Sequence, residues 1–278
     1  MDEQNNRLPL RRGIYLLPNL LTTGALFAGF YAIIAAIDGN FERAGVAVFV
    51  AMIFDGLDGR VARLTSTESA FGKEYDSLSD MVSFGLAPAI VSYQWGVARI
   101  AEYGPVWARI GWLAAFFFAV AAALRLARFN TRAAADKRYF EGLPSPSAAA
   151  IVAAFVWFSS SWREPGLTGL IVAFAVTALA GALMVSRFNY DSFKQVNLGG
   201  RVPFAYIAIV PLGYALIAFH PPVVLFILFS AYALSGPTVW LYRRLRRRQR
   251  GPDGGGAPAA GAPGPVATDP DDLKRDVP

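Results

Sequence analysis

The sequence predicts an all-α protein, a polytopic membrane helix bundle of about eight transmembrane helices. Of its 278 residues 55% are hydrophobic, and the mean hydropathy is +0.39. Its apolar runs are about 20 residues long, which is the length that a helix needs to cross a bilayer. Basic residues gather in the breaks between these runs, as they do in membrane proteins.

The breaks in hydropathy set the expected spans. These are Tyr15–Ile37, Phe41–Leu64, Phe71–Trp95, Pro105–Arg128, Pro144–Trp162, Gly166–Arg187, Val202–Phe219 and Val223–Tyr242. The prolines at 221 and 222 mark a tight hairpin before the last span, because proline opens helices and cannot continue them. The first apolar run is too long for a signal peptide and lacks a small-residue cleavage site, so we expect it to be retained.

Most basic residues fall on one side of this arrangement, and the other side has only Arg43, Arg99, Arg109 and Arg163. This bias predicts that both termini are cytoplasmic. It accounts for the net charge of +6 without a nucleic-acid partner. We expect a cytoplasmic N-terminal segment at 1–13, a catalytic domain in the cytoplasmic (inner) membrane at 14–243, and a cytoplasmic tail at 244–278. The tail is basic and then rich in glycine, proline and alanine, a composition that predicts disorder.

Four aspartates lie at the cytoplasmic ends of the second and third expected spans. Asp55 and Asp58 are three residues apart on one helix, and Asp76 and Asp80 are four apart on the next, so each pair shares a helix face. The short connection makes the two helices antiparallel neighbours, and the faces can meet. Like charges at close range are unfavourable unless a cation joins them. With no cysteine in the chain, oxygen ligation favours magnesium, manganese or calcium.

Small and basic residues surround these aspartates. Glycines leave room for a ligand close to the backbone, and basic side chains attract phosphate. The residues concerned are Gly56, Gly59, Gly72, Arg60, Arg63 and Lys73. Metal ligands, access and positive charge together indicate a phosphoryl-transfer site. The alternative is that the aspartates only form structural salt bridges with these basic residues.

The same stretch resembles the signature of the CDP-alcohol phosphotransferases. The pattern D-G-x-x-D-G-x-x-A-R, a spacer and G-x-x-x-D-x-x-x-D is complete at Asp55, Gly56, Asp58, Gly59, Ala62, Arg63, Gly72, Asp76 and Asp80. The resemblance implies a six-helix core and a membrane enzyme that moves a phosphatidyl or related group from a CDP-activated donor to an alcohol, releasing CMP. It also suggests a homodimer.

The resemblance further implies the roles of single residues. Asp55, Asp58 and Asp76 would ligate divalent metal, with Asp80 near a second ion and acting as general base. The residues expected to bind the donor, CDP-diacylglycerol, are Asn19, Thr22, Gly56, Gly59, Ala62, Arg63 and, for its charge, Lys73. Pro18 and Asn19 are placed at the cytoplasmic start of the first span.

Three further stretches bear on the acceptor. MVSFGLAPA at 81–89, ALRLARFN at 123–130 and FEGLPSPSAA at 140–149 resemble the phosphatidylserine synthase branch, which implies L-serine as the acceptor. Arg125 and Arg128 are candidates for binding the serine carboxylate or the donor phosphate, or they only anchor the helix end.

Two other functions remain as alternatives. The first is the same chemistry with another acceptor, such as glycerol 3-phosphate, inositol phosphate or choline. The second is an ion-coupled membrane transporter, which also embeds carboxylates in a helix bundle. The clustering of the aspartates at one face, without an internal repeat, disfavours the transporter.

Overall fold

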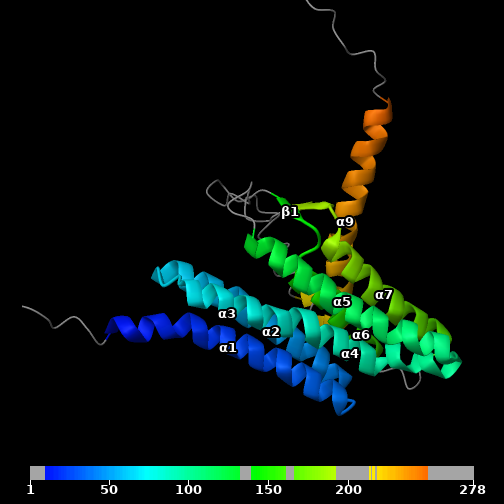
Figure 1. The fold of residues 1–278 in the computed structure, drawn as a ribbon, viewed down its shortest axis with the longest axis horizontal. Coiled ribbons are helices and arrows are strands. Elements are labelled where there is room, and N and C mark those ends of the chain that lie inside the picture. Colours follow the sequence, from blue (N-terminus) through cyan, green and yellow to red (C-terminus); the bar gives the residue numbers. More distant parts are fainter. Residues whose placement is uncertain are drawn as a thin grey trace, which may run out of the picture. The chain divides into compact units, whose positions relative to one another are not determined.

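The computed structural model describes residues 10–131, 139–160, 166–191, 213, 215–216 and 218–249. Its helices are α1 (Leu10–Ile37), α2 (Phe41–Thr65), α3 (Ala70–Asp80), α4 (Ala87–Trp95), α5 (Pro105–Thr131), α6 (Ser145–Ser159), α7 (Leu167–Val185) and α9 (Pro221–Gln249) (Figure 1). A π-helical segment, Met81–Leu86, joins α3 to α4, and a 3₁₀ segment, Val97–Tyr103, precedes α5. The chain forms two compact units, residues 1–240 and 241–278, and the first contains all the elements of the site.

The all-α membrane class is confirmed. Four described helices are long and apolar enough to cross a membrane: Leu16–Ile37, Pro105–Thr131, Leu167–Val185 and Pro221–Arg246. Large apolar side chains lie exposed on their outer faces; Phe27, for example, is 70% exposed. Most of the expected span Val202–Phe219 lies outside the described residues, so the total of eight spans stays a prediction.

Helix α1 begins earlier than the hydropathy indicates. It starts at Leu10, so Pro18 and Asn19 lie inside the helix, close to the start of the apolar span Leu16–Ile37. Hydropathy locates the edge of the apolar run, whereas the hydrogen-bonded helix continues through the basic residues before it. Pro18 removes one backbone donor from the ladder, but the helix continues through it.

The expected third span is one continuous path of three segments. α3 ends at Asp80, the π-helical segment follows at once, and α4 continues to Trp95. Ser83 of the π-helical segment donates a hydrogen bond of 3.0 Å to the carbonyl of Ala25 on α1. A Cβ at Gly29 would lie 2.5 Å from the Ser83 hydroxyl oxygen, so the glycine permits this close approach.

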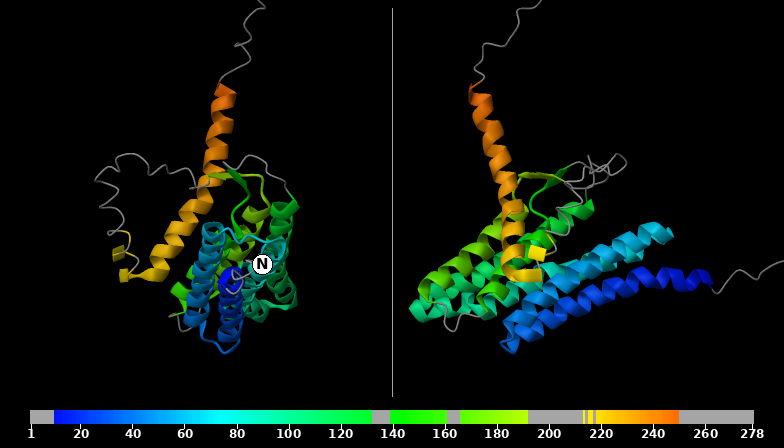
Figure 2. Two further views of the ribbon diagram at one scale, coloured as in Figure 1. Left: turned by 90° about the vertical axis from the view of Figure 1, so that its left-hand side faces the viewer. Right: turned by 180° about the vertical axis from the view of Figure 1, so that it is seen from behind.

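Small residues fill the core of the bundle. Buried alanines on α1, α2 and α6 bring the helix backbones close together, with Phe84 and Trp95 among the larger side chains. α1 and α2 lie side by side along their length, as both views of Figure 2 show. Between α4 and α7, the hydroxyls of Ser92 and Thr177 share a buried hydrogen bond of 2.6 Å.

A short antiparallel ribbon joins two distant loops. Strand β1 (Tyr139–Glu141) pairs with β2 (Asn189–Asp191), with Phe140 opposite Tyr190. After β1 the chain turns at Gly142, whose φ of +77° favours glycine. A Cβ at Gly142 would also collide with the carbonyl oxygen of Met184. This turn leads directly into α6 at Ser145.

Candidate active site

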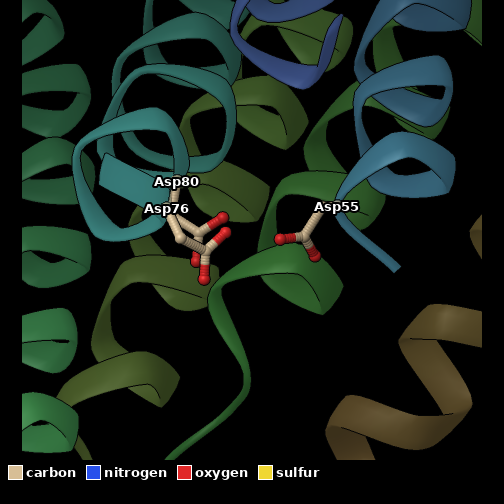
Figure 3. Close-up of side chains that lie close together, drawn as sticks. All are labelled: Asp55, Asp76 and Asp80. Carbon is tan, nitrogen blue, oxygen red and sulfur yellow. The ribbon is translucent and has the colours of Figure 1, made fainter. Parts of the chain in front are cut away.

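Three aspartates meet between α2 and α3. Asp55 on α2 and Asp76 and Asp80 on α3 each place one carboxylate oxygen within 4.8 Å of the others. Figure 3 shows the three carboxyl groups turned toward one another, and all three residues are half-buried. None of them forms an ion pair with a basic residue in the described part of the chain. The alternative that these aspartates serve only in structural salt bridges therefore has no support among the described residues.

The geometry of this cluster suits a divalent cation. Three carboxylates at this range repel one another in surroundings where water is scarce. One oxygen of Asp76 is buried and has no hydrogen-bond partner among the described residues. A buried oxygen without a partner is unfavourable, and a hard cation with oxygen ligands would satisfy it and offset the repulsion. Asp55, Asp76 and Asp80 are therefore the residues that could hold a metal ion.

Asp58 lies beside this group and is fixed from α1. Its Oδ2 accepts a hydrogen bond of 2.7 Å from the Thr22 hydroxyl, which also lies 3.1 Å from the carbonyl oxygen of Pro18. Asp58 is 5% exposed and lies outside the set of three mutually close carboxylates. The structure thus gathers three of the four predicted ligands into one cluster and holds the fourth next to it.

A cavity of about 550 Å³ opens beside Asp58 and Asp76. Its volume is typical of a small-molecule site. Six of the seven residues predicted to bind the donor line it: Asn19, Thr22, Gly59, Ala62, Arg63 and Lys73. Gly56 does not line this cavity. A Cβ on Gly56 would meet nothing within 4 Å, so the glycine faces open space.

Three other residues that line the cavity were not predicted from the sequence. Thr67 and Ser69 come from the turn between α2 and α3, and Ser69 accepts a hydrogen bond from the Gly72 amide as the N-cap of α3. Phe129 reaches the cavity from α5. Ser69 could have been predicted as an N-cap, because serine is a preferred residue directly before a helix. The position of Phe129 depends on how α5 packs, which no local pattern reveals.

Arg125, on α5, does not line this cavity. Its guanidinium donates a hydrogen bond of 3.0 Å to the Ser145 hydroxyl at the start of α6, and the charge of Asp80 acts on it. Its buried Nε has no partner within the described part of the chain. The Arg128 side chain makes no hydrogen bond or ion pair with a described residue, so only one of the two candidate arginines is built into the site.

Comparison with known proteins identifies the relatives of this chain. The family model for CDP-alcohol phosphatidyltransferases matches residues 15–188. A CDP-diacylglycerol–serine O-phosphatidyltransferase of Helicobacter pylori is 35% identical over 82% of this chain and 92% of its own length. One from Mycobacterium leprae is 30% identical over 79% of this chain and 72% of its length. An archaetidylserine synthase of Methanothermobacter thermautotrophicus is 35% identical over 63% of this chain and 69% of its length.

Removing one carboxylate charge tests the cation site. We expect Asp76→Asn to weaken Mn²⁺ binding by at least about tenfold, because loss of even an outer-shell partner weakens metal binding by that factor. The measurement is titration of purified protein with Mn²⁺, followed by electron paramagnetic resonance of the free ion. Asp38→Asn makes the same chemical change at an exposed position beyond the end of α1 and should leave the affinity unchanged. Equal affinities of the two variants would contradict a metal ligand at Asp76.

Proposed function

Because the chain belongs to the CDP-alcohol phosphatidyltransferase family, we propose that it transfers the phosphatidyl group of CDP-diacylglycerol to the hydroxyl of L-serine, giving phosphatidylserine and CMP. One observation carries the proposal: the acidic cluster lies beside a cavity lined by six of the seven residues that we expect to bind the donor. The names of the Helicobacter and Mycobacterium relatives support serine as the acceptor, and so does that of the archaetidylserine synthase.

The metal would be held by the four aspartates. Asp55, Asp76 and Asp80 supply the close carboxylates, and Asp58 adds a fourth beside them, enough for two ions of magnesium or manganese. Bound metal would neutralise charge on the phosphates of the donor. Arg63 and Lys73 line the cavity and would bind the pyrophosphate oxygens by charge.

Asp80 is the residue that we assign as general base. The serine hydroxyl attacks the phosphorus of the phosphatidyl group and loses its proton to the Asp80 carboxylate. The bond from that phosphorus to the bridging oxygen breaks, and CMP leaves with the electron pair. Asp80, like Asp55, does not line the donor cavity, whereas Asp58 and Asp76 do. The family resemblance favours Asp80 over Asp55.

We further propose that the active site faces the cytoplasm in the cytoplasmic membrane and that the chain acts as a homodimer. The orientation follows from the basic residues that accompany the aspartate-bearing helix ends, such as Arg60, Arg63 and Lys73. Serine and CMP are water-soluble and would exchange with that side, whereas the lipid enters from the bilayer. The dimer rests on the family resemblance.

Release of CMP tests the activity directly. Purified protein with CDP-diacylglycerol and Mn²⁺ or Mg²⁺ should release CMP and form phosphatidylserine when L-serine is added. Glycerol 3-phosphate, inositol phosphate and choline should each support less than about a hundredth of that rate, because a site built to pair polar groups strongly rejects ligands that leave them unpaired. A faster rate with one of these alcohols would replace serine as the acceptor.

Substitution of the proposed base separates binding from chemistry. We expect Asp80→Asn to bind CDP-diacylglycerol normally and to lose kcat by about 10²–10⁴, the usual contribution of a general base. Donor binding is measured by equilibrium binding of radiolabelled lipid, and turnover by CMP release. Asp38→Asn is the control for the change of charge. Full turnover in Asp80→Asn would remove Asp80 from this role.

The two arginines provide a matched pair for the acceptor side. Lysine keeps the charge but loses the planar fork that grips a carboxylate. We expect Arg125→Lys to raise the KM for serine by about tenfold, equivalent to ~1.4 kcal/mol of binding, while the KM for CDP-diacylglycerol changes by less than about twofold. Arg128→Lys should change neither constant. The reverse pattern would assign the acceptor contact to Arg128.

A further inference from the structure

A groove runs along the pair of helices α1 and α2, apart from the donor cavity. Its volume is about 920 Å³, and no residue that lines it also lines the donor cavity. On α1 its lining includes Gly24, Phe27 and Tyr31, whereas the carbonyls of Thr22 and Ala25 accept hydrogen bonds from α3 and the π-helical segment. At 3.6 residues per turn these two sets lie on opposite faces of α1. The groove therefore faces away from the active site.

The surface of the groove is largely apolar. Ala28 and Ala47 are buried in it, and beside them Phe27 is 70% exposed. A Cβ at Gly24 would lie 3.1 Å from the ring of Phe54, so the glycine lets that ring lie against α1. Small buried residues next to large exposed ones leave a hollow that a hydrocarbon chain can fill. Exposed apolar surface of this kind marks a ligand or membrane contact.

The length of the groove matches the thickness of one leaflet of a bilayer. It extends from Leu20 to Tyr31 on α1 and from Arg43 to Phe54 on α2. At a rise of ~1.5 Å per residue each of these stretches is about 17 Å long. The hydrocarbon core of a bilayer is ~30 Å thick, so one leaflet contributes about half of that. A single acyl chain of a phospholipid, lying along the two helices, therefore fits the groove.

Charged side chains line the groove at one end only. Glu42 and Arg43 stand exposed at the start of α2, at the opposite end of that helix from the aspartates of the site. Neither makes an ion pair or a side-chain hydrogen bond with a residue in the described part of the chain. Near the other end, the Thr23 hydroxyl is already bonded to the carbonyl of Asn19. The groove thus has the polarity of a lipid, with one charged end and one apolar end.

The two charges also indicate the kind of headgroup. A phosphate would pair with the Arg43 guanidinium, and a primary ammonium with the Glu42 carboxylate. Asp38, exposed in the adjoining hairpin, adds a second negative charge at this end, which disfavours a headgroup that is anionic overall. The apolar face of a helix from a second copy of the chain would supply a partner for neither charge.

We propose that this groove is a binding site for a zwitterionic aminophospholipid of the leaflet opposite to the active site. One acyl chain lies between α1 and α2, the phosphate binds to Arg43, and the ammonium binds to Glu42. The site shares no residue with the donor cavity, so it holds whether or not the chain transfers phosphatidyl groups to serine.

The test is photo-crosslinking in vesicles of phosphatidylcholine that contain phosphatidylethanolamine with a diazirine in its acyl chain. Mass spectrometry of the digested protein should find adducts in the stretches 20–31 and 43–54. Val50→Trp places a ring in the groove and should lower this labelling by about tenfold, the effect of overpacking a filled site. Val172→Trp is the matched control: it lies on α7, outside the groove, with 38% exposure against 37% for Val50, and should leave the labelling unchanged.

Two further variants test the headgroup. Arg43→Gln should lower the labelling by about fivefold, the contribution of one basic residue near a membrane surface, whereas Arg109→Gln, exposed near the start of α5, should not. Unlabelled phosphatidylethanolamine should compete better than phosphatidylglycerol, and Glu42→Gln should remove that difference by removing the partner of the ammonium. Equal competition by the two lipids in the unaltered protein would overturn the assignment of the headgroup.

A second copy of the chain in the groove is the outcome that would overturn the lipid. Because the sequence has no cysteine, Val50→Cys introduces a single thiol. It should stay monomeric on oxidation in the same vesicles; disulfide-linked dimers without lipid adducts would assign the groove to a second copy. Size-exclusion chromatography monitors folding, and if Val50→Trp does not fold, Arg43→Gln decides. Labelling that neither variant lowers would overturn the site.

Discussion

The repulsion between three carboxylates is the constraint on which the site depends. Asp55, Asp76 and Asp80 are half-buried and have oxygens within 4.8 Å of one another. An arrangement of this kind does not persist through hydrophobic packing alone, since burial makes each charge less favourable and each repulsion stronger. The surrounding contacts hold it from several directions. Thr22 fixes Asp58 from α1, and Asn130 of α5 donates to the Ser77 hydroxyl on α3, between Asp76 and Asp80.

The π-helical segment after Asp80 helps to keep the aspartates facing the site. A π turn contains more residues than an α turn, so it changes which side chains face each neighbour beyond it. Before the turn, Asp76 and Asp80 face the site. Within it, Ser83 bonds to α1 and Phe84 is fully buried in the core. The change of helical period lets one continuous path present carboxylates to the site and then pack closely against α1.

The spacing of the aspartates in the sequence predicts most of the acidic cluster. The intervals of three and four residues place the aspartate pairs on helix faces, and the short connection between α2 and α3 brings those faces together. The signature around them also includes six of the residues that line the neighbouring cavity: Asp58, Gly59, Ala62, Arg63, Gly72 and Asp76. Features that depend on tertiary packing could not be predicted in this way. Nothing in the sequence of Met81–Leu86 distinguishes a π turn from an α turn, and the three-residue strands pair across about fifty residues.

The contact between β2 and α9 illustrates why tertiary packing was harder to predict than the aspartate cluster. α9 reads in the sequence as an ordinary membrane span, and Tyr190 lies on a strand of three residues. The Tyr190 ring fits over Gly236, and its hydroxyl donates to the Ala233 carbonyl, whose helical donor Pro237 removes. No local pattern in the sequence indicates that these residues complement one another.

The separation of the two sides has a chemical consequence. Displacement at phosphorus brings the attacking and leaving oxygens roughly into line on opposite sides of the reacting atom. The cavity reaches Asp58 and Asp76, whereas Asp80 does not line it and acts by its charge on Arg125, which bonds to Ser145 at the start of α6. A phosphorus held at the aspartates would have the nucleotide on the α1 and α2 side. The acceptor hydroxyl would then approach from the side of Arg125, where Asp80 can take its proton. In this proposed geometry the nucleotide lies toward α1 and α2, and the acceptor lies toward α5 and the start of α6.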